Sequence, residues 1–223
     1  MKKLNKRIIA KMIDHTDIRI GSKAKDIKKL CEEIKEFGFG GICILPKWVR
    51  FVKKEMKGID VKIVVLVDEP IGDSLHKTRL RICKKIKRDG GHHIDIVNSI
   101  PNVKHGRWDE VLKDLRTICR VLPTKVIIGS GYLTDDEIVK ACQVAKKAGA
   151  ICVKTATSKD PLEHRELKEK FYHLRLMKKS APGLLVKASG KIKSLKDLKD
   201  AVRAGANIIG TSSGVKIIRE LNK

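Results

Sequence analysis

The sequence DDEIVKACQVAKKAGAICVK, residues 135–154, contains the unit that decides the fold. Its first part carries apolar residues at helical spacing, a Gly–Ala junction follows at Gly149, and the apolar run at 151–153 has the length of a buried strand. A glycine at this place suits a helix C-terminal cap, where the backbone takes a left-handed conformation. The segment therefore predicts an amphipathic helix that leads directly into a short strand buried on both faces.

The same unit recurs along the chain and predicts a parallel sheet. It is found again as IKKLCEEIKEFGFGGICIL at 27–45, LRICKKIKRDGGHHIDIV at 80–97 and LKDLKDAVRAGANIIG at 195–210. With the apolar segments between these copies, the predicted strands are one near Ile13 and others at 42–45, 63–67, 94–97, 126–128, 151–153, 184–186 and 208–209. Strands that alternate with helices in this way indicate a parallel sheet covered by helices.

The number of these units predicts a barrel. Eight of them in 223 residues predict a single-domain α/β protein over residues 1–223, a (β/α)8 barrel of the TIM-barrel type. A doubly wound open sheet is the alternative, but no glycine-rich dinucleotide fingerprint follows the first strand. Thr134 and Glu137 form a predicted capping box, which places the start of the helix after the fifth strand.

The composition is that of a globular chain and excludes several classes of protein. A hydrophobic content of 42% is enough for an ordinary core, and no stretch approaches the ~18 apolar residues of a membrane helix. The basic start, MKKLNKRIIAKMIDHT, has no apolar core of signal-peptide length, so we expect a cytoplasmic protein without membrane attachment. The six cysteines form no C-x-x-C pair, so we expect neither a disulfide framework nor a metal site.

The net charge of +24 predicts attraction to anions. Nucleic acid, acidic membrane surfaces and phosphorylated metabolites are the candidate partners. The lysines are spread along the whole chain, and aromatic residues, at 4%, are too few for a base-stacking platform. We therefore do not expect nucleic acid as a specific partner, and lysine-rich surfaces also occur in proteins from hot environments.

Two lysines and a carboxylate are predicted to meet at the mouth of the barrel. Active-site groups of this fold lie at the C-terminal ends of the strands. Lys154 and Lys187 follow the sixth and seventh strands, and Asp95 lies within the fourth strand, where alternation points it into the barrel. A lysine at the end of a buried strand is costly, which favours a functional reason. The alternative is that both lysines reach solvent at the rim and Asp95 is their structural ion-pair partner.

This grouping of charges suggests a kind of chemistry. Two ammonium groups in one pocket repel each other, so we expect a lowered pKa for at least one of the two lysines. A lysine pKa ordinarily near ~10.4 can fall toward ~7–8, where the free amine is a nucleophile. An amine nucleophile beside a second proton-handling group is suited to Schiff-base chemistry on an aldehyde or ketone.

Six short motifs resemble, in the correct order, those of the deoxyribose-phosphate aldolase family, whose members are class I aldolases with a (β/α)8 barrel. The motifs are IDHT at 13–16, ICILPKWV at 42–49, IDIVNSI at 94–100, CVKTAT at 152–157, VKASG at 186–190 and IGTSSGV at 209–215. The resemblance implies that Lys154 forms an imine with acetaldehyde, that Lys187 perturbs Lys154, and that Asp95 with Lys187 relays protons through a water. The enamine would attack glyceraldehyde 3-phosphate, so the implied substrate is a phosphorylated sugar, with no metal or organic cofactor.

The resemblance and the strand ends also supply predicted substrate-binding residues. They are Asp14, Lys159, Gly190, Lys193, Gly210, Ser212 and Ser213. Asp14 could orient a substrate hydroxyl or pair with a lysine, and its sequence context does not decide between these roles. Ser212 and Ser213 precede the last helix, where serine is also an ordinary N-cap. Because this turn ends a barrel strand, we favour phosphate binding by its hydroxyls and free amides.

The chain departs from the family pattern around the substrate. Lys191 stands where the family has the second glycine of Gly-Gly-Ile-Arg, and its side chain could obstruct a phosphate or replace lost amide contacts with its ammonium. At four other places this chain differs from the family motif: it has Thr157-Ser158-Lys159 in place of Thr-Gly, Asp68-Glu69-Pro70 in place of Gly-Phe-Pro, Gly129-Ser130 in place of Glu-Thr, and His92-His93 in place of Asp-Glu. In addition, the family's Gly/Ala-rich loop is replaced by SKDPLEHRELKEK at 158–170, which predicts an early helix. Adjacent strand residues point to opposite faces, so His92 and His93 are not expected to share a metal ion.

The residues that match the family's catalytic motifs are kept, whereas several residues around the expected substrate differ from the family pattern. The expected activity is reversible cleavage of 2-deoxy-D-ribose 5-phosphate to acetaldehyde and D-glyceraldehyde 3-phosphate. A related Schiff-base aldolase with a different aldehyde substrate, with or without a phosphate, is one alternative. A non-catalytic basic barrel that binds nucleic acid or a phosphorylated ligand is another. Assembly into a homo-oligomer stays open, because no interface can be read from the sequence.

Overall fold

The computed structural model describes residues 5–157, 159–161 and 167–222. Its strands form a closed parallel barrel in which each strand pairs with the next along the chain and β8 pairs with β1. They are β1 (Ile13–Asp17), β2 (Gly41–Ile44), β3 (Lys62–Val67), β4 (His93–Val97), β5 (Thr124–Ile127), β6 (Cys152–Lys154), β7 (Leu185–Ser189) and β8 (Ile208–Thr211). The predicted (β/α)8 barrel is confirmed, with all eight strands present at shifted boundaries.

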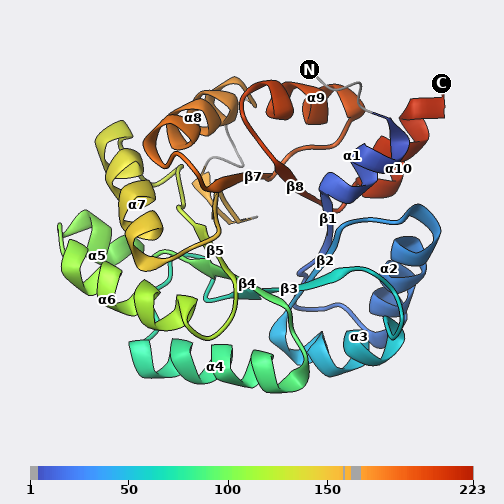
Figure 1. Ribbon diagram of the computed structural model, residues 1–223, viewed down its shortest axis with the longest axis horizontal. Helices are drawn as coiled ribbons and strands as arrows, with labels where there is room; N and C mark the ends of the chain where they lie inside the picture. Colours follow the sequence, from blue (N-terminus) through green and yellow to red (C-terminus); the bar gives the residue numbers. More distant parts are fainter. Residues whose placement is uncertain (1–4, 158, 162–166, 223) are drawn as a thin grey trace.

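Helices surround the barrel on its outside, as Figure 1 shows in a view along the barrel. They are α1 (Lys6–Met12), α2 (Ala24–Phe37), α3 (Val49–Glu55), α4 (His76–Asp89), α5 (Ile100–Lys104), α6 (Trp108–Cys119), α7 (Asp135–Ala148), α8 (Leu167–Ser180), α9 (Leu195–Arg203) and α10 (Gly214–Arg219), with the short 3₁₀ helices η1 (Pro46–Trp48) and η3 (Glu220–Asn222). The first and last helices, α1 and α10, pack side by side. Of the early helix expected at 158–170, residues 158 and 162–166 lie outside the described residues, and residues 167–170 form the start of α8.

The main hydrophobic core lies between the barrel wall and the helices. Outward-facing strand residues such as Ile96 and Val126 pack there with the apolar faces of the helices. A second, small apolar cluster of Leu66, Val97 and Ile127 lies on alternate strand positions, inside the barrel. Other interior positions carry the charged side chains of Asp14, Asp95, Lys125 and Lys187, so the barrel interior can hold polar chemistry.

The junctions between helices and strands follow the sequence signals. Helix α7 ends at Gly149, whose φ of 91° is left-handed, and α2 ends in the same way at Gly38 with a φ of 69°. An L-residue with a Cβ rarely adopts this conformation, which explains why the repeated unit carries glycine there. The predicted helix caps at these two glycines are confirmed.

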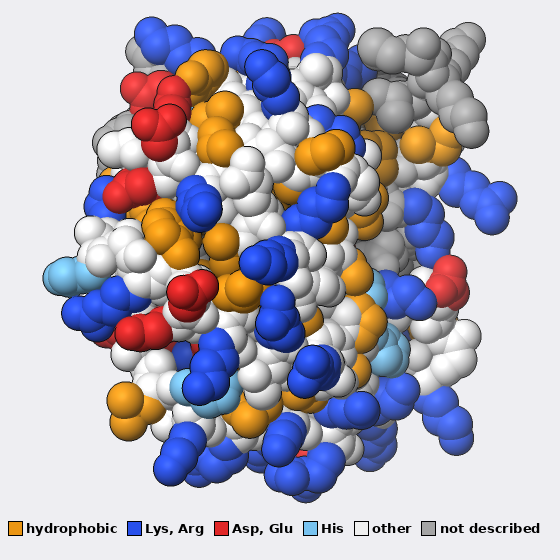
Figure 2. All heavy atoms as spheres, turned by 60° about the vertical axis from the view of Figure 1, so that its left-hand side comes forward, with side chains coloured by type: hydrophobic (Ala, Val, Ile, Leu, Met, Phe, Trp, Pro, Cys, Tyr) orange, Lys and Arg blue, Asp and Glu red, His pale blue; other side chains and the backbone are white. Residues whose placement is uncertain are grey.

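The surface is basic and lacks a single dense stripe on the face that Figure 2 shows, where Lys and Arg side chains are scattered among apolar and neutral ones. This agrees with the spread of the 50 lysines and arginines along the chain. Among the described residues, no helix combines the length and the apolar character needed to cross a bilayer.

The capping box at the start of α7 provides a test of local stability. Thr134 Oγ1 accepts a hydrogen bond from the Glu137 backbone N–H at 3.3 Å, and Glu137 Oε2 accepts one from the Thr134 N–H at 2.8 Å. Replacement Thr134→Ala removes the first bond, so we expect the free energy of unfolding in urea to fall by about 1 kcal/mol. Thr134→Ser, which keeps the hydroxyl, is the control, and equal stability of all three proteins would contradict the role of the cap.

Candidate active site

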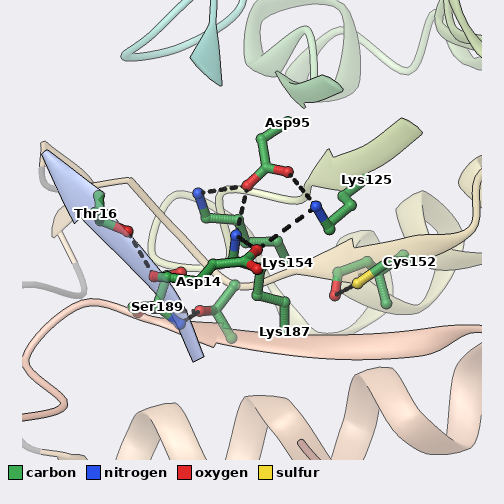
Figure 3. A network of polar contacts seen from close by, with 10 residues as sticks. Asp14, Thr16, Asp95, Lys125, Cys152, Lys154, Lys187 and Ser189 are labelled. Carbon is green, nitrogen blue, oxygen red and sulfur yellow. Dashed lines mark hydrogen bonds and ion pairs between the residues drawn. The ribbon is translucent and has the colours of Figure 1, made fainter. Parts of the chain in front are cut away.

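Asp95 lies at the centre of a buried polar network inside the barrel (Figure 3). Its Oδ2 accepts hydrogen bonds from Lys187 Nζ at 2.9 Å and from Lys154 Nζ at 3.1 Å, and its Oδ1 accepts one from Lys125 Nζ at 3.1 Å. Asp95 and Lys187 have no exposed surface, and Lys154 is 4% exposed. Strands β4, β6 and β7 therefore bring the predicted catalytic residues Asp95, Lys154 and Lys187 into direct contact.

Asp14 on β1 is the second carboxylate of this network. Its Oδ2 accepts a hydrogen bond from Lys187 Nζ and lies 3.6 Å from Lys125 Nζ. Gly41, its register partner on β2, leaves the space for this carboxylate, because a Cβ at position 41 would lie 2.1 Å from Asp14 Oδ1. Of the two roles left open for Asp14, the structure shows the pairing with a lysine, and contact with a substrate hydroxyl stays a prediction.

Lys125 is a network residue that the sequence analysis missed. The predicted fifth strand began at Val126, whereas β5 begins at Thr124 and places Lys125 opposite Asp95 in the register of the two strands. A lysine inside an otherwise apolar run, two positions before Ile127, was the available signal, because alternation points both side chains to the same face.

The charges in the network fix the protonation of two of its members. Burial alone would raise the pKa of Asp95, but Lys125, Lys187 and Lys154 together hold it well below its usual range. Burial alone would lower the pKa of Lys187, but Asp14 and Asp95 hold it well above its usual range. Lys187 is therefore an ammonium beside the Asp95 carboxylate, and it is not the lysine whose pKa was expected to fall. A free amine on Lys154 stays a prediction.

A cavity of about 490 Å³ opens at the C-terminal end of the barrel. Five of the predicted substrate-binding residues line it, namely Gly190, Lys193, Gly210, Ser212 and Ser213. Among the network residues, all of which lie in the described part of the chain, only Lys154 lines this cavity. A molecule in the cavity thus meets one lysine of the network, Lys154, while the groups that hold this lysine stay covered.

Further cations line the same cavity beside the predicted Lys193. They are Lys191, whose φ of 54° is left-handed, and Arg19, which the sequence analysis did not single out. Asp17 orients Arg19 through contacts of 2.6 Å to Nη2 and 3.1 Å to Nε. Three cationic side chains and the serine hydroxyls of the turn after β8 make this end of the cavity suitable for an anion.

Comparison with known proteins agrees with this geometry. A family model described as DeoC/LacD family aldolase matches residues 8–220. The chain belongs to this family. It is therefore an aldolase, which is a carbon–carbon lyase.

Individual relatives of this aldolase match over nearly their whole length. A deoxyribose-phosphate aldolase from Caldanaerobacter subterraneus subsp. tengcongensis is 37% identical over 222 residues, which are 96% of this chain and 94% of the relative. One from Aciduliprofundum boonei is 36% identical over 224 residues, 98% and 99% of the two chains. The solved structure of deoxyribose phosphate aldolase from Aeropyrum pernix, described as a unique tetrameric structure, aligns with a TM-score of 0.87 at 25% identity, over 96% of this chain and 91% of that chain.

The turn after β8 of this aldolase leaves its serine hydroxyls available. Ser213 is the N-cap of α10, but its side chain makes no capping hydrogen bond, and its backbone N–H donates to Thr211 Oγ1 at 2.9 Å. Gly210 has a packing role as well, because a Cβ there would lie 2.9 Å from Lys187 Cε. The ordinary capping role of Ser213 is thus not realised, which leaves its hydroxyl open to a ligand.

The loops after β3 and β6 place other residues of this aldolase beside the site. Lys159, predicted to bind substrate, lies outside the wall of the cavity, and its Nζ is 3.7 Å from Glu69 Oε1. Asp68, which follows β3, accepts a hydrogen bond of 2.8 Å from the buried guanidinium of Arg79. Glu69 Oε2 is buried and has no hydrogen-bond partner among the described residues.

His92 and His93 face opposite sides of the barrel wall, as predicted. His92 Nδ1 accepts a hydrogen bond from the Ile63 N–H at 3.1 Å, whereas His93 begins β4 on the same face as Asp95. Burial, then the positive charge of Lys125, lowers the pKa of His93 to about 4. His93 is therefore a neutral imidazole in the interior of the barrel at neutral pH.

The lowered pKa of His93 predicts a specific loss of stability in acid. The unfolded chain binds this proton below a pH of about 6.5, and the folded protein binds it only near pH 4, so the stability contributed by the neutral ring is lost as the pH falls between these values. Allowing for partial exposure of the ring, we expect the loss to be about 1–2 kcal/mol.

Urea unfolding at about pH 7.5 and about pH 4.5 measures this effect. The loss of unfolding free energy between the two conditions should be smaller in His93→Gln than in the unmodified protein, because glutamine does not titrate. An equal loss in the two proteins would show that His93 is not the group responsible.

Proposed function

We propose that this aldolase cleaves 2-deoxy-D-ribose 5-phosphate reversibly to acetaldehyde and D-glyceraldehyde 3-phosphate, through a Schiff base on Lys154. The observation that carries the proposal is that Lys154 alone joins the buried network to the cavity among the described network residues. The names of the relatives from Caldanaerobacter and Aciduliprofundum, deoxyribose-phosphate aldolase, support the same substrate.

The covalent steps follow from an amine nucleophile at this position. In the cleavage direction, Lys154 Nζ attacks the aldehyde carbon of the open-chain sugar, and loss of water gives a protonated imine. The bond between the second and third sugar carbons then breaks. Its electron pair moves toward the imine nitrogen while the hydroxyl on the third carbon gives up its proton, so glyceraldehyde 3-phosphate leaves. Protonation of the remaining enamine and hydrolysis of the imine release acetaldehyde and restore the amine.

Proton transfer in these steps is assigned to the network below Lys154. Lys187 stays protonated because Asp14 and Asp95 raise its pKa, so it can donate a proton and recover it. Asp95 contacts both Lys154 and Lys187, at 3.1 Å and 2.9 Å, and can link them through a water that enters with the substrate. The predicted catalytic set is therefore Lys154 as nucleophile, with Lys187 and Asp95 as the proton relay.

The phosphate end of the substrate is assigned to the loops after β7 and β8. Gly190, Lys193, Ser212 and Ser213 line the cavity there, and the serine hydroxyls and the Lys193 ammonium are groups that bind phosphate in proteins. Lys191 adds a second ammonium from a left-handed position. We assign it to the phosphate as a replacement for amide contacts.

A relative that uses a different aldehyde is the second candidate. Glu69 favours it, because the carboxylate Oε2 of Glu69 is buried without a partner among the described residues, beside the loop that follows the Lys154 strand. Glu69 lies outside the wall of the cavity, so a polar or cationic aldehyde would supply such a partner by extending beyond it. The two candidates share the Lys154 imine and differ in the aldehydes they accept.

Assembly and location are proposed on narrower grounds. The tetrameric description of the Aeropyrum pernix structure supports a homo-oligomer for this aldolase, which light scattering after size-exclusion chromatography can test. The six cysteines are free thiols, which supports a reducing, cytoplasmic location. Nucleic acid and membrane partners are not part of the proposal.

Trapping of the imine tests the proposed mechanism. With acetaldehyde and borohydride, we expect a reduced two-carbon adduct on Lys154, located by mass spectrometry of peptides, and complete loss of adduct and turnover in Lys154→Ala. Lys159→Ala is the control for a nearby lysine that lies outside the cavity wall. Aldolase turnover retained by Lys154→Ala would refute the mechanism.

Removal of the Lys191 ammonium tests the phosphate assignment. In Lys191→Gly we expect kcat/KM for 2-deoxyribose 5-phosphate to fall about tenfold, because a charge-assisted hydrogen bond contributes roughly 1.5–3 kcal/mol. The same ratio for unphosphorylated 2-deoxyribose should be unchanged. A rise in kcat/KM for the phosphorylated sugar would mean that the side chain obstructs the phosphate.

A further inference from the structure

The buried network contains more ammonium groups than carboxylates. Its lysines are Lys125, Lys154 and Lys187, and its carboxylates are Asp14 and Asp95. Two thiols also face it, Cys43 from β2 and Cys152 from β6, and burial raises the pKa of both, to about 12 for Cys152, so they stay neutral. With all five of these groups ionised, the network that the described residues form carries one net positive charge.

His93 lies at the N-terminal end of this network. It precedes Asp95 by two residues on β4, so both side chains point into the barrel. Its Nδ1 is buried and has no hydrogen-bond partner among the described residues. Burial and then Lys125 lower its pKa to about 4, with Lys62 acting in the same direction and Asp14 and Asp95 opposing it. The position beside Lys125 that could hold a compensating carboxylate is thus filled by a neutral ring.

We propose that His93 is a positioning residue for imine formation, because its neutral ring leaves the excess positive charge of the network uncompensated and so favours release of a proton from Lys154. This inference rests on the proposed function, in which the Lys154 amine is the nucleophile. An uncompensated charge in a protein interior costs several kcal/mol, and loss of one proton removes that cost.

The contacts of the lysines identify Lys154 as the one that releases the proton. Lys187 contacts both Asp14 and Asp95, and Lys125 lies 3.1 Å from Asp95 and 3.6 Å from Asp14. Among the described carboxylates, Lys154 contacts Asp95 alone, at 3.1 Å, and it lines the cavity through which a proton can reach water. Loss of the proton from Lys154 therefore breaks the fewest ion pairs. It leaves a neutral network of two charged lysines and two carboxylates.

The pH dependence of imine trapping tests this role. In His93→Glu, the new carboxylate lies beside Lys125 and balances the network while all three lysines are charged. We expect the midpoint of the pH profile for acetaldehyde trapping on Lys154 to move upward by about one pH unit, with the trapping rate near neutral pH lower by about tenfold. His93→Gln, which adds no charge, should keep the midpoint of the unmodified protein.

His92→Glu is the matched control, because it places the same charge at the neighbouring position on the opposite face of the wall. It should leave the midpoint unchanged. Lys125→Met is a second route to a balanced network, since it removes one ammonium and keeps a similar shape, and it should also move the midpoint upward. Thermal unfolding shows which variants are folded, and Lys125→Met keeps the test decisive where His93→Glu does not fold.

The outcomes separate this inference from the proposed function. An upward shift in His93→Glu and in Lys125→Met, with none in His92→Glu, supports the role of His93. If the pH profiles of His93→Glu and His93→Gln coincide, the inference is overturned. Where His93→Glu does not fold, an unshifted midpoint in Lys125→Met overturns it. In both cases an adduct on Lys154 still supports the proposed mechanism. Absence of any adduct on Lys154 in the unmodified protein overturns both.

Discussion

The ion pairs of Asp95 are the interaction on which the interior of the barrel depends. Three lysines share this one carboxylate, and each would be costly to bury without it. Strand register places the pairs, since Asp95 lies opposite Lys125 and Lys154 lies opposite Lys187. Glycine at 41 keeps the wall close enough for Asp14 to join them. Removing the Asp95 charge would leave three ammonium groups facing one carboxylate, which no rearrangement of the same side chains could balance.

The network gives its lysines different tasks through unequal pairing. Among the described residues, Lys187 touches two carboxylates and stays charged, while Lys154 touches one and borders the cavity. The apolar cluster of Leu66, Val97 and Ile127 fills other inward positions of the barrel and limits access of water to the ion pairs. In such surroundings a change of one charge has a large effect on proton affinity, because water screens it weakly. A single neutral side chain, His93, can for this reason influence an amine that it does not touch.

Much of the fold and part of the site could be predicted from the sequence. The helix–glycine–strand unit is a local signal. It predicted the barrel because each copy places a buried strand next to the previous one and a helix outside it. Asp95, Lys154 and Lys187 followed from alternation and strand ends. Lys125 was missed because the strand start was placed after it, and the contact of Asp14 with lysines depends on closure of β1 onto β8, which sequence spacing does not encode. Lys159 and Arg19 lie on loops, whose paths are set by tertiary contacts rather than by periodicity.

The division between strands and loops also accounts for the pattern of change around the site. The charged network sits on strands of the closed barrel, which hold its members in contact across the interior, so a substitution there leaves a buried charge unpaired. The anion end of the cavity sits on the loops after β7 and β8, where a lysine at 191 is accommodated in a left-handed conformation. Loops tolerate such replacements because their side chains reach solvent. The Schiff-base chemistry is therefore constrained by the barrel itself, whereas recognition of the phosphate or of another aldehyde can vary without disturbing it.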